Sequence, residues 1–164
     1  MTKLRKHQEQ FERMKRWYER IKKIDQGMPH NLSFINLPSG YFYDEFYAFF
    51  VNCYHLKDWI ENDDTVKPLE LEKKVEHFMK QSECMCVCRD ICIGIKHLEQ
   101  KSSTWSGQVP KFKRRELSLS LVGGPKPIIN VKFYIETKTG TIDAFELASE
   151  CVRKWGEFIK DNIN

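Results

Sequence analysis

The chain has 164 residues, of which 41% are hydrophobic and 13% aromatic, and its formal net charge is only +4. This length and composition predict one globular domain with its own core and exclude an intrinsically disordered chain. The sequence has no apolar run of the roughly 18 residues that a membrane span needs and no apolar signal-peptide core, so we expect no membrane partner and a cytoplasmic protein with reduced cysteines.

The positive charge is concentrated near the N-terminus. Residues 1–27 hold nine Lys or Arg and four Asp or Glu, a net charge of +5, which leaves about −1 for the rest of the chain. Over residues 4–26 the hydrophobic side chains recur at three- and four-residue steps, which predicts a long amphipathic helix that Gly27 and Pro29 end. The basic face of this helix can bind phosphates, bind an acidic partner or simply face water.

Three further helices are expected in the first part of the chain. An ordered loop over 28–43 precedes a helix over 44–62, for which Asp44 is the expected N-cap. A third helix is expected over about 68–81, since a proline suits its first turn. The fourth, over about 82–98, has an apolar sector and an opposite sector that gathers charged side chains.

The second part of the chain changes from helical periodicity to alternation. A connector with a basic run is expected over 102–115, followed by strands at 117–121 and 129–136 and by a brief third strand. Asp143 with Glu146 matches a capping box, which predicts a closing helix that ends near the C-terminus.

These elements predict a mainly α, α+β fold: a bundle of about five helices with a small antiparallel β-sheet before the C-terminal helix. We expect one domain over residues 1–164, with four helices in 1–101, the connector and β-hairpin in 102–143, and the closing helix in 144–162.

The cysteines of the fourth helix suggest a metal site at first sight. This helix holds four of the six: Cys84, Cys86, Cys88 and Cys92. Zinc sites usually take cysteine pairs from turns, at gaps of two to four residues, with a second distant pair. Here Cys84, Cys88 and Cys92 recur every four residues on the apolar sector, which is typical of core packing. The other two, Cys53 and Cys151, also fall on the apolar faces of their predicted helices. We therefore expect no metal, and no cofactor motif is present.

The opposite sector of the fourth helix is the candidate site. It holds Arg89, Asp90, Lys96 and His97. One hypothesis is a metal-independent ribonuclease in which His97 is the general acid and base, Arg89 and Lys96 hold a phosphate, and Asp90 orients His97.

A buried polar network is the alternative to this site. In it, Asp90 orients His97 or His55, and Arg89 pairs with an acid of the second helix such as Asp58. His55 and Asp58 are therefore the possible supporting residues. The remaining histidines, at positions 7, 30 and 77, are expected on the surface.

Three stretches resemble an uncharacterised bacterial family with the motifs HLxDW, DxANGxKH and DAxELAxxCVxxW. The matching residues are 54–59, 90–98 and 143–155, with Ile93 in place of the family's Asn. The stretches and the helical order are similar to HEPN-type domains, many of which are dimeric ribonucleases or toxin components. The HEPN motif places four to six residues between an Arg and a His, whereas seven separate Arg89 from His97.

This resemblance implies a HEPN-like interaction domain without demonstrated catalysis, with a homodimer as a possible assembly and a setting in bacterial or phage defence or on mobile elements. The two alternatives are the ribonuclease described above and a basic module that binds RNA or another nucleic acid through the first helix. Whether the chain is an enzyme stays open at this point.

Overall fold

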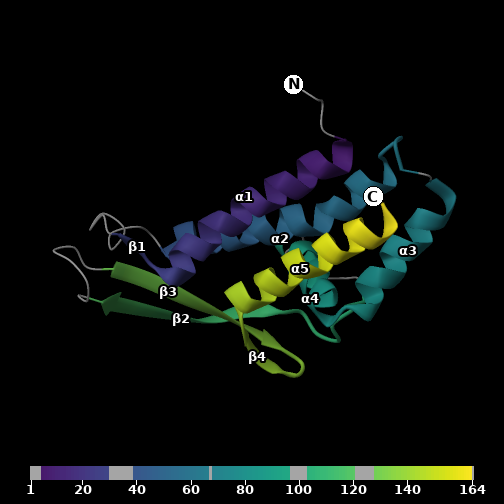
Figure 1. Ribbon diagram of the computed structural model, residues 1–164. Helices are drawn as coiled ribbons and strands as arrows, with labels where there is room; N and C mark the ends of the chain where they lie inside the picture. The colour runs from purple at the N-terminus through teal and green to yellow at the C-terminus, as the bar shows by residue number, and fades with distance from the viewer. Residues whose placement is uncertain (1–4, 30–38, 67, 97–102, 121–127, 164) are drawn as a thin grey trace.

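The computed structural model describes residues 5–29, 39–66, 68–96, 103–120 and 128–163. Within these ranges five helices and four strands follow the predicted order, and the mainly α, α+β class is confirmed (Figure 1). The elements are α1 (Lys6–Gln26), β1 (Met28–Pro29), α2 (Ser39–Glu61), α3 (Pro68–Gln81), α4 (Glu83–Lys96), β2 (Lys111–Ser120), β3 (Ile128–Thr137), β4 (Gly140–Asp143) and α5 (Ala144–Asn162). None of the helices in the described ranges combines the length and the apolar character needed to cross a membrane.

The sheet is built around β3, which pairs antiparallel with each of the other strands. The predicted connector is wrong beyond residue 110, because β2 already begins at Lys111 and pairs with β3 over its whole length. The reason is packing: Phe112 is half-buried and packs against the core, with its ring centroid 6.0 Å from that of Phe46, while Lys111 and Lys113 beside it stay exposed. The alternation therefore starts inside the basic run.

The helices form a bundle over one face of the sheet, with α1 and α2 side by side and α4 next to α2 and α5 (Figure 1). The expected N-cap at Asp44 is wrong, because α2 already begins at Ser39. Phe42, which precedes Asp44, is 5% exposed and its ring packs against Phe133 of β3. Residues 39–43, which were expected to belong to the loop before Asp44, are therefore part of the helix, and this places the Phe42 ring against the sheet.

Two predicted features of α5 and α1 have different outcomes. Asp143 caps α5 as expected, since its Oδ1 accepts hydrogen bonds from the backbone N–H groups of Phe145 and Glu146. The surface position expected for His7 is wrong: its side chain is fully buried, and its Nδ1 lies 2.7 Å from Asp63 Oδ2. The same oxygen accepts the backbone N–H of His7 at 3.0 Å, so a residue of the α2–α3 connection binds the first turn of α1. His77 is exposed as expected, and His30 lies outside the described residues.

Candidate functional site

Arg89 and Asp90 form a buried ion pair on α4. Arg89 Nη1 lies 2.6 Å from Asp90 Oδ1, and the two residues are 8% and 0% exposed. The second carboxylate oxygen of Asp90 accepts two hydrogen bonds from Ser106, one from its backbone N–H and one from its hydroxyl, each at 2.7 Å. Both carboxylate oxygens therefore have protein partners, as a buried charge requires.

The segment 103–108 covers this pair. Arg89 Nη1 also donates to the backbone carbonyl of Ser103 at 3.0 Å, and the Arg89 guanidinium lies 4.7 Å from the ring centroid of Trp105. The hydroxyl oxygen of Ser106 also lies 2.9 Å from the carbonyl oxygen of Gln108. The segment 103–108 thus covers this sector of α4. Of the two hypotheses for Arg89 and Asp90, a buried polar network fits their contacts, and the two side chains do not line an open cleft.

The other two residues of the expected catalytic group lie further along α4. Lys96 is the last residue of the helix and is exposed. Seven residues along a helix correspond to about 10 Å of rise, so Lys96 lies a full two turns from the Arg89–Asp90 pair. His97 lies outside the described residues. In the part of the chain that is described, Arg89 and Asp90 are therefore brought together and Lys96 is not.

The supporting residues form their own group on α2. His55 Nδ1 lies 3.3 Å from Asp58 Oδ2, with the two side chains 51% and 41% exposed, and Lys57 also pairs with Asp58. The expected pairing of Arg89 with Asp58 is wrong, because Arg89 pairs with its own neighbour Asp90. The carboxylate of Asp90 is bound by Arg89 and Ser106 and not by His55. Exposed pairs of the His55–Asp58 kind contribute little to stability.

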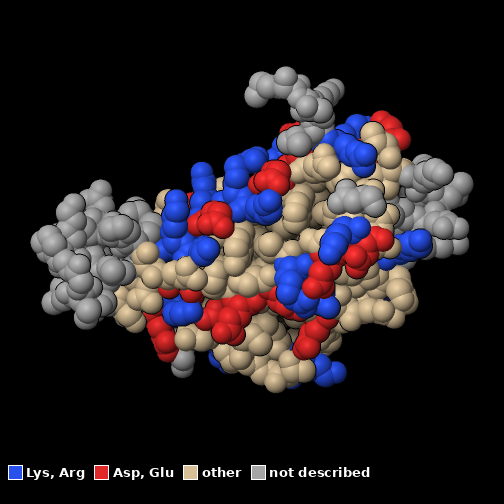
Figure 2. Space-filling view, viewed as in Figure 1, with Lys and Arg blue, Asp and Glu red and all other residues tan. Residues whose placement is uncertain are grey.

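The exposed face of α1 carries a run of positive charge. Residues 15–23 contain five Lys or Arg and one Glu, and we call them the cationic segment. Lys15 pairs with Glu12 at 2.6 Å, and Arg20 lies 3.6 Å from Glu45. No ion pair within the described ranges involves the other three, Arg16, Lys22 and Lys23. Figure 2 shows blue side chains in a band along α1, whereas red and blue alternate over α5.

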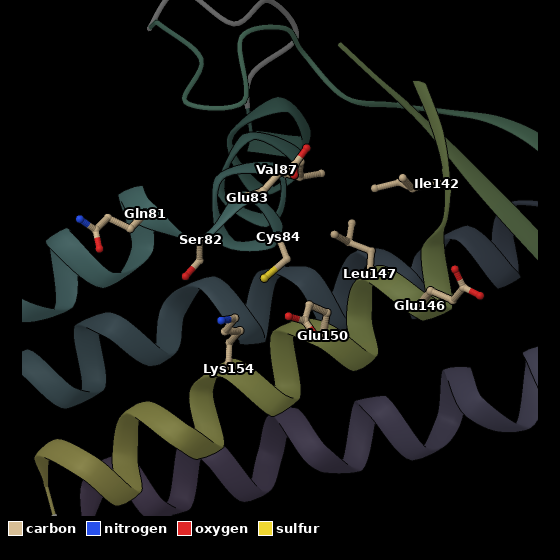
Figure 3. Close-up of a pocket in the computed structure, with 10 residues that line it drawn as sticks. All are labelled: Gln81, Ser82, Glu83, Cys84, Val87, Ile142, Glu146, Leu147, Glu150 and Lys154. Atoms are coloured by element: carbon tan, nitrogen blue, oxygen red, sulfur yellow. The ribbon is translucent and has the colours of Figure 1, made fainter. Parts of the chain in front are cut away.

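A pocket of about 380 Å³ lies between the start of α4, the end of α3, β4 and α5 (Figure 3). The residues that line it are Gln81, Ser82, Glu83, Cys84, Val87, Ile142, Glu146, Leu147, Glu150 and Lys154. Cys84 lies on its floor and points from α4 toward α5, where Glu150 and Lys154 face it. The lining carries three carboxylates and one ammonium group, with apolar side chains between them.

Three cysteines from different helices meet next to this pocket. The Sγ atoms of Cys53 on α2, Cys88 on α4 and Cys151 on α5 all lie within 4.8 Å of one another, and each residue is fully buried. Among the described residues this is the one group of three or more His, Cys, Asp or Glu side chains with ligand atoms close enough to share a metal ion. All six cysteines are buried and free. Cys84, Cys88 and Cys92 occupy the expected apolar sector of α4, and Cys86, which was not assigned to that sector, is buried as well.

The sequence did not reveal two of these groups. The partners in the His7–Asp63 pair and in the three-cysteine group lie far apart in the chain, and no local motif connects them. The weak signal was in the apolar faces, since Cys53, Cys88 and Cys151 were each assigned to the inner side of a helix. Comparison of the chain with protein-family models, with curated proteins and with solved structures found no match.

Proposed function

We propose that this chain is a HEPN-like binding domain, without catalytic activity at α4, that binds RNA through the cationic segment of α1. The observation that carries the proposal is the charge of that segment: three cations at residues 16, 22 and 23 have no ion-pair partner in the described ranges, and a single Glu lies among them. When Lys and Arg side chains neutralise the phosphates of a nucleic acid, counterions condensed on it are released, and this release favours binding of the nucleic acid to such a surface.

The cationic segment is held on a rigid element. α1 has 21 residues, and its opposite face buries Met14, Ile21 and Ile24 in the core. The guanidinium of Arg20 lies 4.4 Å from the ring centroid of Trp17, which orients that side chain on the helix surface. Cations on a fixed helix keep their spacing, so less conformational entropy is lost when they contact successive phosphates.

The state of Arg89 and Asp90 supports a binding role over catalysis. A phosphate-binding Arg must reach its substrate, but the Arg89 guanidinium is already engaged by Asp90, Ser103 and Trp105. Opening this site would require displacing the 103–108 segment and leaving Asp90 buried without its partner, which is costly. The ribonuclease alternative therefore has less support than RNA binding without cleavage.

Fluorescence anisotropy with a labelled 20-nucleotide single-stranded RNA of mixed sequence tests the binding proposal. The chain should bind, with a steep loss of affinity between about 50 and 200 mM salt. The triple variant Arg16→Gln/Lys22→Gln/Lys23→Gln should lower the steepness of the log–log salt plot by about 2, since each contact with a single strand contributes about 0.7.

A matched control separates local charge from net charge. The control variant Lys111→Gln/Lys138→Gln/Lys160→Gln also removes three positive charges, but from exposed residues outside α1, and it should leave the salt dependence nearly unchanged. Equal losses in both triple variants, or binding that salt does not weaken, would contradict the proposal.

The same RNA also tests the competing hypothesis. We expect it to stay intact after prolonged incubation with the protein. Cleavage by the wild-type chain that disappears in His97→Ala would contradict the non-catalytic proposal and favour the ribonuclease. The mass in solution, compared with 19.6 kDa for one chain, tests the homodimer that the resemblance implies.

A further inference from the structure

The three-cysteine group lies where α2, α4 and α5 meet in the core. Its thiols have few other contacts: Cys88 Sγ lies 3.5 Å from the carbonyl oxygen of Phe50, and Cys151 Sγ lies 3.5 Å from that of Cys84. Thiols are weak donors, so these contacts hold the two side chains only loosely. The three sulfur atoms instead face one another across a common centre.

We propose that Cys53, Cys88 and Cys151 form a three-coordinate thiolate site for a single soft d¹⁰ metal ion, and that Cu(I) is the ion that fits it. The proposal stands on the convergence of three fully buried sulfur atoms from three helices. It is independent of the proposed RNA binding, which uses the exposed face of α1 and none of these three cysteines.

The distances suit this coordination. Metal–sulfur bonds of about 2.3 Å in a trigonal plane place the sulfur atoms about 4 Å apart. The three Sγ atoms here lie within 4.8 Å of one another, so each needs to move by less than about 1 Å. Side-chain rotation on packed helices can supply such a movement without repacking the core.

The number of ligands favours Cu(I) over Zn²⁺. Structural zinc sites are almost always tetrahedral and need a fourth ligand, whereas soft thiolate sites also select Cu(I). Cys84 is next to Cys151 but does not belong to the group whose sulfur atoms are mutually close. Three sulfur atoms make a complete shell only for an ion that accepts three ligands.

Binding at this group exchanges protons for the metal ion. A cysteine binds a metal as the thiolate, so each of the three thiols would lose its proton to solvent when its sulfur binds the ion.

The pocket on the α4–α5 side provides a path to the site. Cys84 is 7% exposed on its floor (Figure 3), and its backbone carbonyl oxygen lies 3.5 Å from Cys151 Sγ. Glu146 and Glu150 on the pocket wall attract cations toward this thiol. Cys84 is therefore placed to receive the ion first and to pass it inward by exchange of one sulfur ligand for another.

The other cysteines of α4 are matched controls. Cys86 and Cys92 are also buried, at 7% and 6% exposure, but neither belongs to the three-cysteine group. Cys86 Sγ instead contacts the carbonyl oxygens of Met79 and Lys80. A variant at Cys92 thus removes one buried thiol from α4, the helix that carries Cys88, without removing a proposed ligand.

The test is anaerobic titration of the reduced full chain with Cu(I) in competition with a chromophoric chelator. We expect one Cu(I) per chain by native mass spectrometry, and three sulfur ligands by X-ray absorption spectroscopy. Substitution of a residue that only contacts a metal ligand lowers metal affinity by about 10–100-fold. Cys151→Ala removes a ligand itself, so it should weaken Cu(I) binding by more than this. Cys92→Ala should bind as the wild type does.

The wild-type measurements keep the test informative if Cys151→Ala does not fold, which its far-ultraviolet circular dichroism would show. Failure of the wild-type chain to take up one Cu(I), two sulfur ligands instead of three, or equal losses in Cys92→Ala and Cys151→Ala would each overturn the proposal. Tighter binding of Zn²⁺ than of Cu(I), in a parallel titration, would overturn the choice of ion.

Discussion

Removal of the Asp90 carboxylate should destabilise the fold strongly. In Asp90→Ala, the Arg89 guanidinium keeps its charge at 8% exposure, and the backbone N–H of Ser106 loses its acceptor. Breaking a buried ion pair from one side costs about 3–5 kcal/mol. We therefore expect a loss of about 4 kcal/mol, and at about 2–4 °C per kcal/mol for a chain of this size, Tm falls by about 8–16 °C.

A double-mutant cycle isolates the pair from the rest of the site. Arg89→Met removes the charge but leaves Asp90 with both hydrogen bonds from Ser106, so we expect a smaller loss of about 3 kcal/mol. The double variant no longer contains an unpaired buried charge and should lose about 4–5 kcal/mol, less than the sum of the single losses. The coupling energy is then about 2–3 kcal/mol, at the upper end for contacting residues.

Urea unfolding of the wild type, the two single variants and the double variant, followed by circular dichroism, measures these free energies of unfolding with a two-state analysis. Lys96→Met is the control, because it removes an exposed cation from the same helix and should change stability by less than about 0.5 kcal/mol. A coupling energy below about 0.5 kcal/mol would refute the conclusion that Arg89 and Asp90 act as a structural pair.

Two further predictions concern other buried carboxylates. Burial raises the pKa of Asp63, but hydrogen bonds from His7 and Thr65 outweigh it and leave the folded-state pKa below the ordinary value of about 3.9. The stability that Asp63 contributes is therefore present above about pH 4 and lost as the pH falls further. In urea unfolding, the difference in unfolding free energy between the wild type and Asp63→Asn should shrink at acid pH. A difference that stays constant from about pH 3 to 7 would contradict this. Lys132→Met should cost about 2 kcal/mol, because Asp25, 4% exposed, loses the ammonium group 2.9 Å away. Burial raises the pKa of Asp25, and loss of Lys132 raises it further, so thermal scans should show a larger loss at pH 7 than near pH 4.

The helices were predictable where local signals and burial agree. α3 occupies Pro68–Gln81 as expected, since a proline that suits the first turn and an apolar stripe both indicate the same element. α5 likewise follows the cap at Asp143. The strand β3 was recognisable because apolar and polar side chains alternate over residues 129–136, most of its length.

Local signals failed where contacts with distant residues outweigh them. Asp44 is a good N-cap by type, yet Phe42 before it packs against Phe133 from the other half of the chain, and the helix starts earlier. The basic residues of β2 suggested a connector, but Phe112 and the pairing with β3 impose a strand. In both cases the deciding contact is aromatic burial, which exceeds a cap or a propensity difference in free energy.

The candidate site shows the same limit for polar residues. Helical spacing placed Arg89 and Asp90 on a face opposite the apolar sector, and that placement left two hypotheses open, a site that faces a substrate and a buried polar network. Spacing cannot show what covers a face, and here Ser106, 16 residues after Asp90, supplies the partners that make burial of the carboxylate tolerable. The cysteines present the reverse case: their apolar positions were foreseen, but packing of three helices was needed to bring three thiols to one point. A charged helical face is therefore weak support for a site until its cover is known, and an apolar face can conceal ligands that only the tertiary structure brings together.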